Sequence, residues 1–209
     1  MEELTLIAPG ERDHPAIMSK RHGNRARTLF EPLLAHQRIL RGIIDKQLGE
    51  WLGIRLLDLR DPNAVRDNAL IRLQQLPSRE TLHAWDDELS LALGGKADEK
   101  TLSLLLATML DGFPRGMVPN IRTYVEGTLL VIADQALSPE ILAAAILRIW
   151  RKDRFPPTIA ELLDECDHAL QGAANARRVV AKMIALMDNA EEVLIATGDI
   201  NEGTTAMRP

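Results

Sequence analysis

Two consecutive prolines, Pro156 and Pro157, constrain the fold of this chain more than any other feature of its sequence. Proline has no backbone N–H and a fixed φ, so neither residue fits inside a helix, and each disfavours the α conformation in the residue before it. Thr158 and Glu161 then form a capping box, in which each side chain accepts a hydrogen bond from a backbone N–H at the start of a helix. We therefore predict that one helix ends before Phe155, whose ring seals the corner, and that the next begins at Thr158.

Composition and further helix caps extend this prediction to the rest of the chain. Ala and Leu are plentiful and runs of β-branched residues are rare, which favours helices over sheets. Capping residues precede apolar stripes of helical spacing at Asp61-Pro62, Ser78, Asp98 and Ser138-Pro139. We predict an all-α fold with almost no β structure: a helical bundle in two parts, joined near Gly94-Gly95.

The apolar pattern changes along the chain and divides it into four segments. Before Thr28, apolar residues are too few to form a core, and Pro9-Gly10 and Pro15 break any helix. From Thr28 a long helix is expected, with Pro32 in its first turn, where a proline is tolerated. The expected segments are a flexible basic arm at 1–28, an N-terminal helical part at 29–93, a C-terminal helical domain with a long final helix at 97–197, and a disordered polar tail at 198–209.

The final helix carries a heptad stripe, because its apolar residues alternate at intervals of four and three from Ile159 to Leu194. If this helix is continuous to Ala196, its length is on the order of 55 Å. Such a stripe can pack against the N-terminal helices of the same chain or form a seam with a second copy, and the sequence leaves both arrangements open. For the second arrangement we predict a homodimer through four seam residues: Leu170, Val180, Ile184 and Met187.

Charge and residue content exclude several classes of function. The formal net charge of −5 argues against a bulk nucleic-acid binder. No apolar run approaches the roughly 20 residues of a membrane span and no signal peptide is recognised, so we expect a cytoplasmic protein with Cys166 as a small, reduced core residue. His36 and the other histidines lack metal-ligand spacing, and neither a nucleophile motif nor a dinucleotide fingerprint occurs. We therefore expect a binding protein and not an enzyme, without a catalytic residue, cofactor or metal.

Two basic clusters are the candidate binding sites. The first, at 20–27, has no acidic residue and is either a strip that contacts DNA phosphates or a solvated tail. Its basic residues are Lys20, Arg21, Arg25 and Arg27.

The second basic cluster gathers before the proline corner, at the end of a helix that we expect to bury Trp150. This placement favours the helix dipole, and the rigid mounting suits a basic surface that docks on an acidic partner protein. The predicted partner-binding residues, with one from a nearby loop, are Arg115, Arg148, Arg151, Lys152 and Arg154.

The stretch 102–165 also resembles a known family. The residues that carry the resemblance are Phe113-Pro114-Arg115, Asn120, Tyr124, Asp134, Ser138-Pro139-Glu140, Ala145, Trp150 and the run from Arg154 to Glu161. This pattern is similar to the small helical unit of phage and prophage replication proteins, the family of replicative-helicase loaders and inhibitors. The resemblance implies a compact helical domain closed by the proline corner. It also implies binding to the hexameric replicative helicase, whose loading on DNA such proteins regulate.

The leading functional prediction combines the resemblance with the absence of a catalytic motif. We expect a non-enzymatic, prophage-type DNA-replication accessory protein that binds and regulates a replicative helicase or an associated replication protein. Two alternatives stay open. One is a dimeric nucleic-acid-binding regulator that uses the basic arm at 20–27, and the other is a mobile-element inhibitor that blocks another host or phage assembly.

Overall fold

The computed structural model describes residues 20–45, 62–114, 116–118, 120–135 and 137–198. Its helices are α1 (Lys20–Leu33), α2 (Ala35–Asp45), α4 (Pro62–Gln75), α5 (Arg79–Gly94), α6 (Glu99–Asp111), α7 (Ile121–Gln135), α8 (Pro139–Lys152) and α9 (Ile159–Ala196). No β-strand occurs within the described ranges. The predicted all-α fold with a long C-terminal helix is confirmed for this part of the chain.

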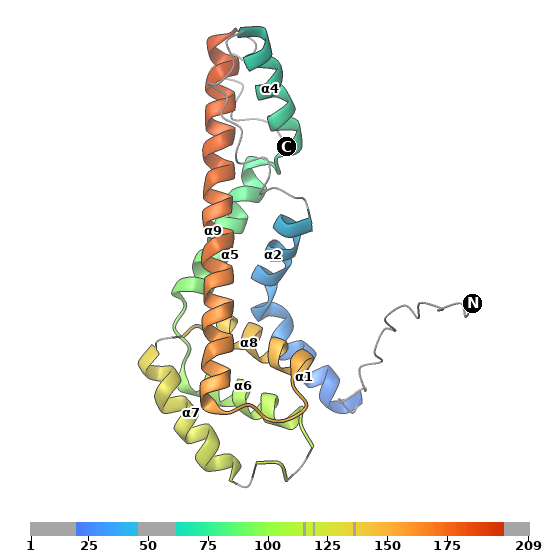
Figure 1. The fold of residues 1–209 in the computed structure, drawn as a ribbon, viewed down its shortest axis with the longest axis vertical. Helices are drawn as coiled ribbons and strands as arrows, with labels where there is room; N and C mark the ends of the chain where they lie inside the picture. The colour runs from blue at the N-terminus through green and yellow to red at the C-terminus, as the bar shows by residue number, and fades with distance from the viewer. Residues whose placement is uncertain (1–19, 46–61, 115, 119, 136, 199–209) are drawn as a thin grey trace, which may run out of the picture.

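The long helix α9 is the axis along which the other helices are arranged (Figure 1). Its 38 residues extend about 57 Å at 1.5 Å per residue. The helix α4 packs near its C-terminal end, α5 along its middle and α8 near its N-terminal end, and α2 also contacts it. The apolar residues that α9 buries are Leu162, Cys166, Ala169, Ala173, Ala176, Val180, Met183, Met187, Ala190 and Leu194.

Only every second residue of the heptad stripe predicted from the sequence belongs to this buried stripe. Cys166, Ala173 and Val180 belong to both, whereas Leu163 and Leu170 of the predicted stripe are only half-buried. At the other positions from Leu163 on, the buried residue lies one place before the predicted one. In three of these cases it is an alanine: Ala169, Ala176 and Ala190. Alanine gives a weak apolar signal in a sequence, yet it is commonly buried in full where helices pack closely.

The predicted oligomerisation residues lie against helices of the same chain. Within a single copy Val180 is fully buried and Met187 is 5% exposed, and Leu170 and Ile184 are half-buried against the core. The stripe therefore packs within its own chain, which was one of the two arrangements that the sequence left open. A homodimer stays a prediction, but these four residues do not offer it an exposed apolar seam.

The core does not divide at Gly94-Gly95. One cluster of buried residues extends from Ala26 to Met187 and draws on both of the predicted parts, while a small second cluster lies between α4 and the end of α9. The Ser138 hydroxyl donates to the carbonyl of Ala92 at 2.6 Å and joins the start of α8 to the end of α5. The two predicted parts therefore share a core, and α9 packs against helices from both.

The N-terminal helix begins earlier than predicted. The helix α1 starts at Lys20, so residues 20–28, which were expected to belong to a flexible arm, are helical. Ala26 and Phe30, four residues apart, are 5% and 3% exposed, and α1 packs on α8. Burial of this apolar pair favours helix in a segment whose basic side chains alone give no reason for it.

The helix predicted from Thr28 is in fact two helices. Pro32 lies in the last turn of α1 and not in the first turn of a helix. Proline lacks the N–H that would bond to the carbonyl four residues earlier, so Pro32 weakens the last turn of α1. The helix α1 ends at Leu33, one residue after Pro32, and α2 begins at Ala35. The predicted end at Gly53 lies outside the described residues.

The proline corner has the predicted cap but not the predicted seal. The Thr158 N–H donates to Oε2 of Glu161 at 2.7 Å, and the Glu161 N–H donates to Oγ1 of Thr158 at 3.2 Å. Phe155, however, is 66% exposed, so the prediction that its ring seals the corner is wrong. Pro157 and Tyr124 take the inner side, where the Tyr124 hydroxyl donates to the Pro157 carbonyl at 2.8 Å. Burial raises the pKa of Tyr124 to about 12.

Candidate partner-binding groove

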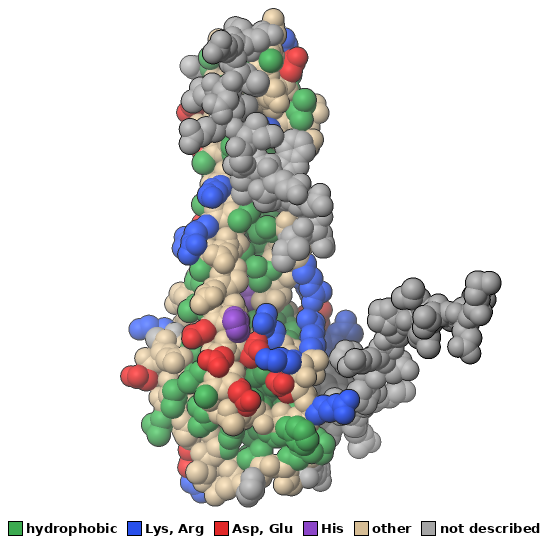
Figure 2. Space-filling view, viewed as in Figure 1, with side chains coloured by type: hydrophobic (Ala, Val, Ile, Leu, Met, Phe, Trp, Pro, Cys, Tyr) green, Lys and Arg blue, Asp and Glu red, His purple; other side chains and the backbone are tan. Residues whose placement is uncertain are grey.

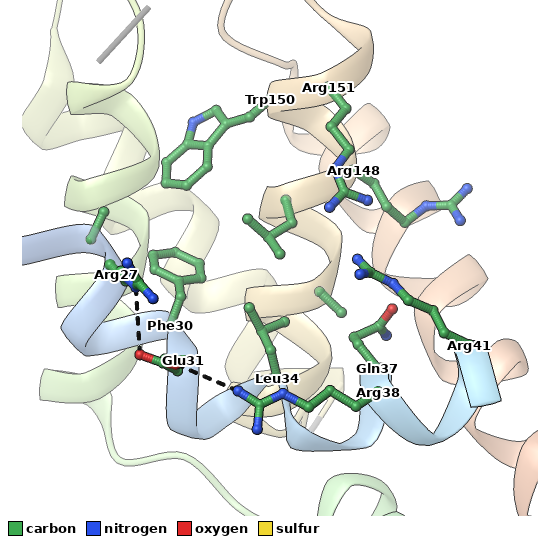
Figure 3. Close-up of a pocket in the computed structure, with 13 residues that line it drawn as sticks. Arg27, Phe30, Glu31, Leu34, Gln37, Arg38, Arg41, Arg148, Trp150 and Arg151 are labelled. Atoms are coloured by element: carbon green, nitrogen blue, oxygen red, sulfur yellow. Dashed lines mark ion pairs between the residues drawn. The ribbon is translucent and has the colours of Figure 1, made fainter. Parts of the chain in front are cut away.

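A groove of about 430 Å³ lies between α1 and α2 on one side and α8 on the other (Figure 3). Its apolar floor consists of Ala26, Phe30, Leu34, Ala144, Leu147 and Trp150. Its polar rim consists of Arg27, Glu31, Gln37, Arg38, Arg41, Arg148 and Arg151. We call this site the arginine groove. Its volume lies within the range of roughly 300–1,000 Å³ that is usual for ligand sites.

The floor of the groove is part of the packed core. The rings of Phe30 and Trp150 lie 5.2 Å apart between centroids, and the Trp150 Nε1–H donates to the carbonyl of Met109 at 3.1 Å. Gly112 leaves room for this indole, because a Cβ at that position would lie 2.5 Å from Nε1 of Trp150. The floor is therefore rigid, which lowers the ordering cost of binding a ligand.

The arginines of the rim differ in what they already bind. Arg27 and Arg38 share Glu31, with Nε–Oε2 and Nη2–Oε1 distances of 3.7 and 3.5 Å, and both guanidinium side chains are more than 70% exposed (76% and 72%). Such long, exposed ion pairs contribute little to stability. Arg41 and Arg151 are exposed and form no ion pair among the described residues.

Arg148 is held by α9. Its Nε–H donates to Oε2 of Glu165 at 2.6 Å, and the Lys152 ammonium donates to Oε1 of the same carboxylate at 3.1 Å. The Glu165 side chain is only 7% exposed. The hydrogen bond from Arg148 lowers the pKa of Glu165, against the opposing effect of burial. Two residues of the predicted basic cluster thus fasten α8 to α9.

The structure brings parts of both predicted clusters to one place. Arg27, from the N-terminal cluster, lines the groove with Arg148 and Arg151, from the cluster before the proline corner. Arg154 is exposed but does not line the groove. The side chains of Lys20, Arg21 and Arg25 and all of Arg115 lie outside the described residues.

Sequence reasoning missed the rim residues on α2. Arg38 and Arg41 follow Arg27, Glu31 and Leu34 at alternating intervals of four and three, the spacing of residues on one side of a helix. Although the segment is divided into α1 and α2, all five residues line the groove. This periodicity is the signal that could have found them. This row consists mostly of charged residues, so it gives no hydrophobic face.

The charge of the groove contrasts with that of the chain. Among the described residues of its lining, five are arginine and Glu31 is the only acidic one, in a chain of net charge −5. Figure 2 shows Lys and Arg side chains gathered over α2 and the neighbouring end of α8, beside a group of Asp and Glu side chains on α9. A local excess of one sign attracts ligands of the opposite sign and raises their rate of encounter.

A second groove, of about 490 Å³, lies between α6 and α7 and lacks this charge excess. It is lined by Lys96, Ala97, Glu99, Leu102, Glu126, Leu129, Leu130, Ile132, Ala133 and Leu137. Its charged residues have both signs, so its lining specifies no ligand charge. We therefore take the arginine groove as the candidate functional site.

Groups that often mark other kinds of site have different roles here. Cys166 is fully buried, as predicted, and burial raises the pKa of its thiol to about 12. His36 is also fully buried, and burial lowers its pKa. The described residues contain no group of His, Cys, Asp and Glu side chains suited to a metal ion. Within the same ranges, no helix combines the length and the hydropathy that a membrane span requires.

Comparisons of this chain with protein-family models, with curated proteins and with solved structures find no match in any of the three. The class of protein is therefore defined by the fold and the site alone. It is an all-helical protein built on a long C-terminal helix, with an arginine-rimmed groove between α1–α2 and α8.

Proposed function

We propose that this protein is a non-enzymatic binding protein that holds an acidic segment of a partner protein in the arginine groove. The observation that carries the proposal is the combination of five arginines, one carboxylate and an apolar floor among the described lining residues. We further propose, from the resemblance of residues 102–165, that the partner is a replicative helicase or an associated replication protein. The protein would then be a DNA-replication accessory of prophage type.

The rim and the floor of the groove contribute to binding in different ways. Exposed arginines steer an acidic surface toward the site and select against basic partners. The partly exposed side chains of the floor, Leu34, Leu147 and Trp150, then supply affinity, because apolar surface removed from water contributes about 25 cal/mol per Å². The floor residues Phe30 and Trp150 are already fixed by packing, so binding does not have to order them.

A second candidate function is nucleic-acid binding. It is favoured by Arg27, which continues the basic stretch at 20–27 into the groove. The floor supports it less well, because Phe30 is only 3% exposed and offers no free ring face on which a base could stack. A salt-dependent binding assay with single-stranded and double-stranded DNA separates this function from the first.

The proposal is tested by capture of purified replicative helicase on the immobilised full-length chain. We compare the wild type with an Arg41→Glu, Arg151→Glu variant. The matched control is an Arg122→Glu, Arg178→Glu variant, which has the same net charge but changes exposed arginines that do not line the groove. The expected result is capture by the wild type and the control but not by the groove variant.

Other outcomes each contradict a named part of the proposal. No capture by the wild type contradicts the helicase as partner, and equal capture by the groove variant contradicts the groove as the contact. The same three proteins, used to capture partners from a host lysate, test for a mobile-element inhibitor. In that case a different host or phage protein would be lost with the groove variant.

A further inference from the structure

The chemistry of the arginine groove specifies its occupant more closely than an acidic partner. We infer that the groove binds a single amphipathic α-helix of a partner protein, with an apolar face flanked by Asp or Glu. This inference rests on the proposed function. We also infer that Glu31 occupies the place of one partner carboxylate in the free protein.

The walls of the groove have the pattern that a third helix would match. On the α1–α2 side, five of the lining residues, from Arg27 to Arg41, recur at intervals of four and three. On the α8 side, Ala144, Leu147 and Arg151 recur at intervals of three and four. Each wall therefore presents apolar side chains toward the floor and guanidinium groups at the rim. An amphipathic helix has the complementary arrangement, with an apolar stripe and charged residues on both flanks.

The dimensions limit the bound segment to a short helix. From Arg27 to Arg41 the wall extends at most about 21 Å at 1.5 Å per residue, which is roughly four turns. The cavity volume of about 430 Å³ is small, so the groove takes the apolar face of one helix and leaves its polar face outside. This is the helix-in-groove mode of recognition, in which a few apolar anchors at helical spacing enter the groove.

Glu31 indicates how the rim binds a carboxylate. Its two oxygens lie 3.7 Å from Arg27 Nε and 3.5 Å from Arg38 Nη2, and its side chain is half-exposed. Each guanidinium has five N–H donors, so neither arginine is saturated by this contact. Since Glu31 repels any acid that approaches the same arginines, its charge weakens the binding of an acidic partner. Replacing it with the neutral isostere Gln removes that repulsion.

The floor argues against the other anionic ligands. A small inorganic anion would use the arginines but would leave the apolar floor uncovered. A nucleic acid would bring its phosphates to the rim, yet the floor offers it little ring surface for stacking, since Phe30 is buried and Trp150 is only partly exposed and packs on Phe30. An acidic amphipathic helix uses both the rim and the floor.

Fluorescence anisotropy with the purified full-length chain tests this inference. The probe is a labelled, end-capped peptide of about 16 residues, with Leu at i, i+3, i+4 and i+7 spacing and Glu or Ala elsewhere. The control peptide has the same composition, with the leucines permuted around all faces of the helix. A single-stranded oligonucleotide serves as the nucleic-acid probe.

We expect the amphipathic peptide to bind about tenfold or more tightly than the permuted one, because only the former places its leucines on the floor and its carboxylates at the rim together. We expect Glu31→Gln to tighten binding about threefold or more, and Arg41→Glu with Arg151→Glu to weaken it about tenfold or more. Equal binding of both peptides, binding of the oligonucleotide alone, or weaker binding by the Glu31→Gln variant would overturn the inference.

This outcome is separable from that of the proposed function. If capture of the helicase depends on Arg41 and Arg151 while neither peptide binds, the groove is the contact but its occupant is not an acidic amphipathic helix. If the peptide binds in the expected way while the helicase is not captured, the inference stands and the partner is a different protein.

Discussion

The two faces of α8 both carry basic side chains, but those toward α9 form ion pairs that hold the fold, whereas Arg151 on the other face is exposed at the groove. On the face toward α9, Arg148 and Lys152 are bound to one buried carboxylate, Glu165, with contacts of 2.6 and 3.1 Å. On the face toward α1 and α2, Arg151 is exposed at the rim of the groove and has no ion pair among the described residues. A basic cluster in a sequence is therefore not one site. What each member does depends on the carboxylate that another helix brings to it.

The largest expected effect on stability concerns Phe30, in the floor of the arginine groove. Phe30→Ala removes a side chain that is 3% exposed and packs on Trp150. We expect the free energy of unfolding to fall by about 3 kcal/mol, because a cavity replaces the ring. Chemical denaturation monitored by circular dichroism measures this loss. A change below about 1 kcal/mol would mean that α1 contributes little to the core.

The ion pairs with α9 should have the next largest effect. Replacing Arg148 and Lys152 together with Ala leaves Glu165 buried without a cation, and we expect a loss of about 2 kcal/mol at pH 7. This figure is lower than for a fully buried pair, because the side chains of both cations are more than half exposed (53% and 69%).

The pH dependence of this loss follows from the lowered pKa of Glu165. A depressed folded-state pKa contributes stability that is fully present above the unfolded value of about 4.3 and is lost as the pH falls through the folded value. The difference between the wild type and the double variant should therefore be full at pH 7 and shrink in acid. A difference that stays constant from pH 7 to pH 3 would contradict the role of this carboxylate.

The proline corner should show a smaller effect, and only at its cap. Thr158→Ala removes the hydroxyl that accepts from the Glu161 N–H and should cost about 1 kcal/mol. Phe155→Ala should change stability by less than about 0.5 kcal/mol, because the ring is 66% exposed. Thermal or chemical denaturation of the two variants side by side checks the order. A larger loss for Phe155→Ala would show that its ring is packed in solution.

The smallest effect on stability is expected for the exposed arginines of the rim that have no ion pair among the described residues, Arg41 and Arg151. Arg41→Glu with Arg151→Glu should change the free energy of unfolding by less than about 0.5 kcal/mol, because neither side chain has an ion pair to lose among the described residues. The same denaturation assay measures it. A loss as large as that of the Arg148 and Lys152 variant would remove the distinction between the two faces.

Local features of this fold could be predicted from the sequence, and contacts between distant segments could not. Ser78, Asp98, Ser138 and Thr158 all accept a hydrogen bond from the first turn of the helix that follows, as their spacing predicts. Each such cap depends on a few adjacent residues, so a short window of sequence contains all the information it requires.

The errors have a common origin in long-range packing. At the proline corner Tyr124, from α7, bonds to Pro157 while Phe155 is exposed, and at the N-terminal end α1, which includes residues 20–28, packs on α8. The candidate site shows the same limit. Arg151 was predicted as a partner contact and lines the groove, but the tertiary fold brings Arg27 to the same groove and buries Glu165 beside Arg148.

In the proposed function, the arginine groove binds an acidic segment through side chains that the fold does not require. The most direct test is the affinity of the full-length chain for the acidic amphipathic peptide, measured by anisotropy for the wild type and the Arg41→Glu, Arg151→Glu variant. We expect the variant to unfold at the same denaturant concentration as the wild type but to bind about tenfold or more weakly. Unchanged affinity in a variant of unchanged stability would contradict this role of the groove.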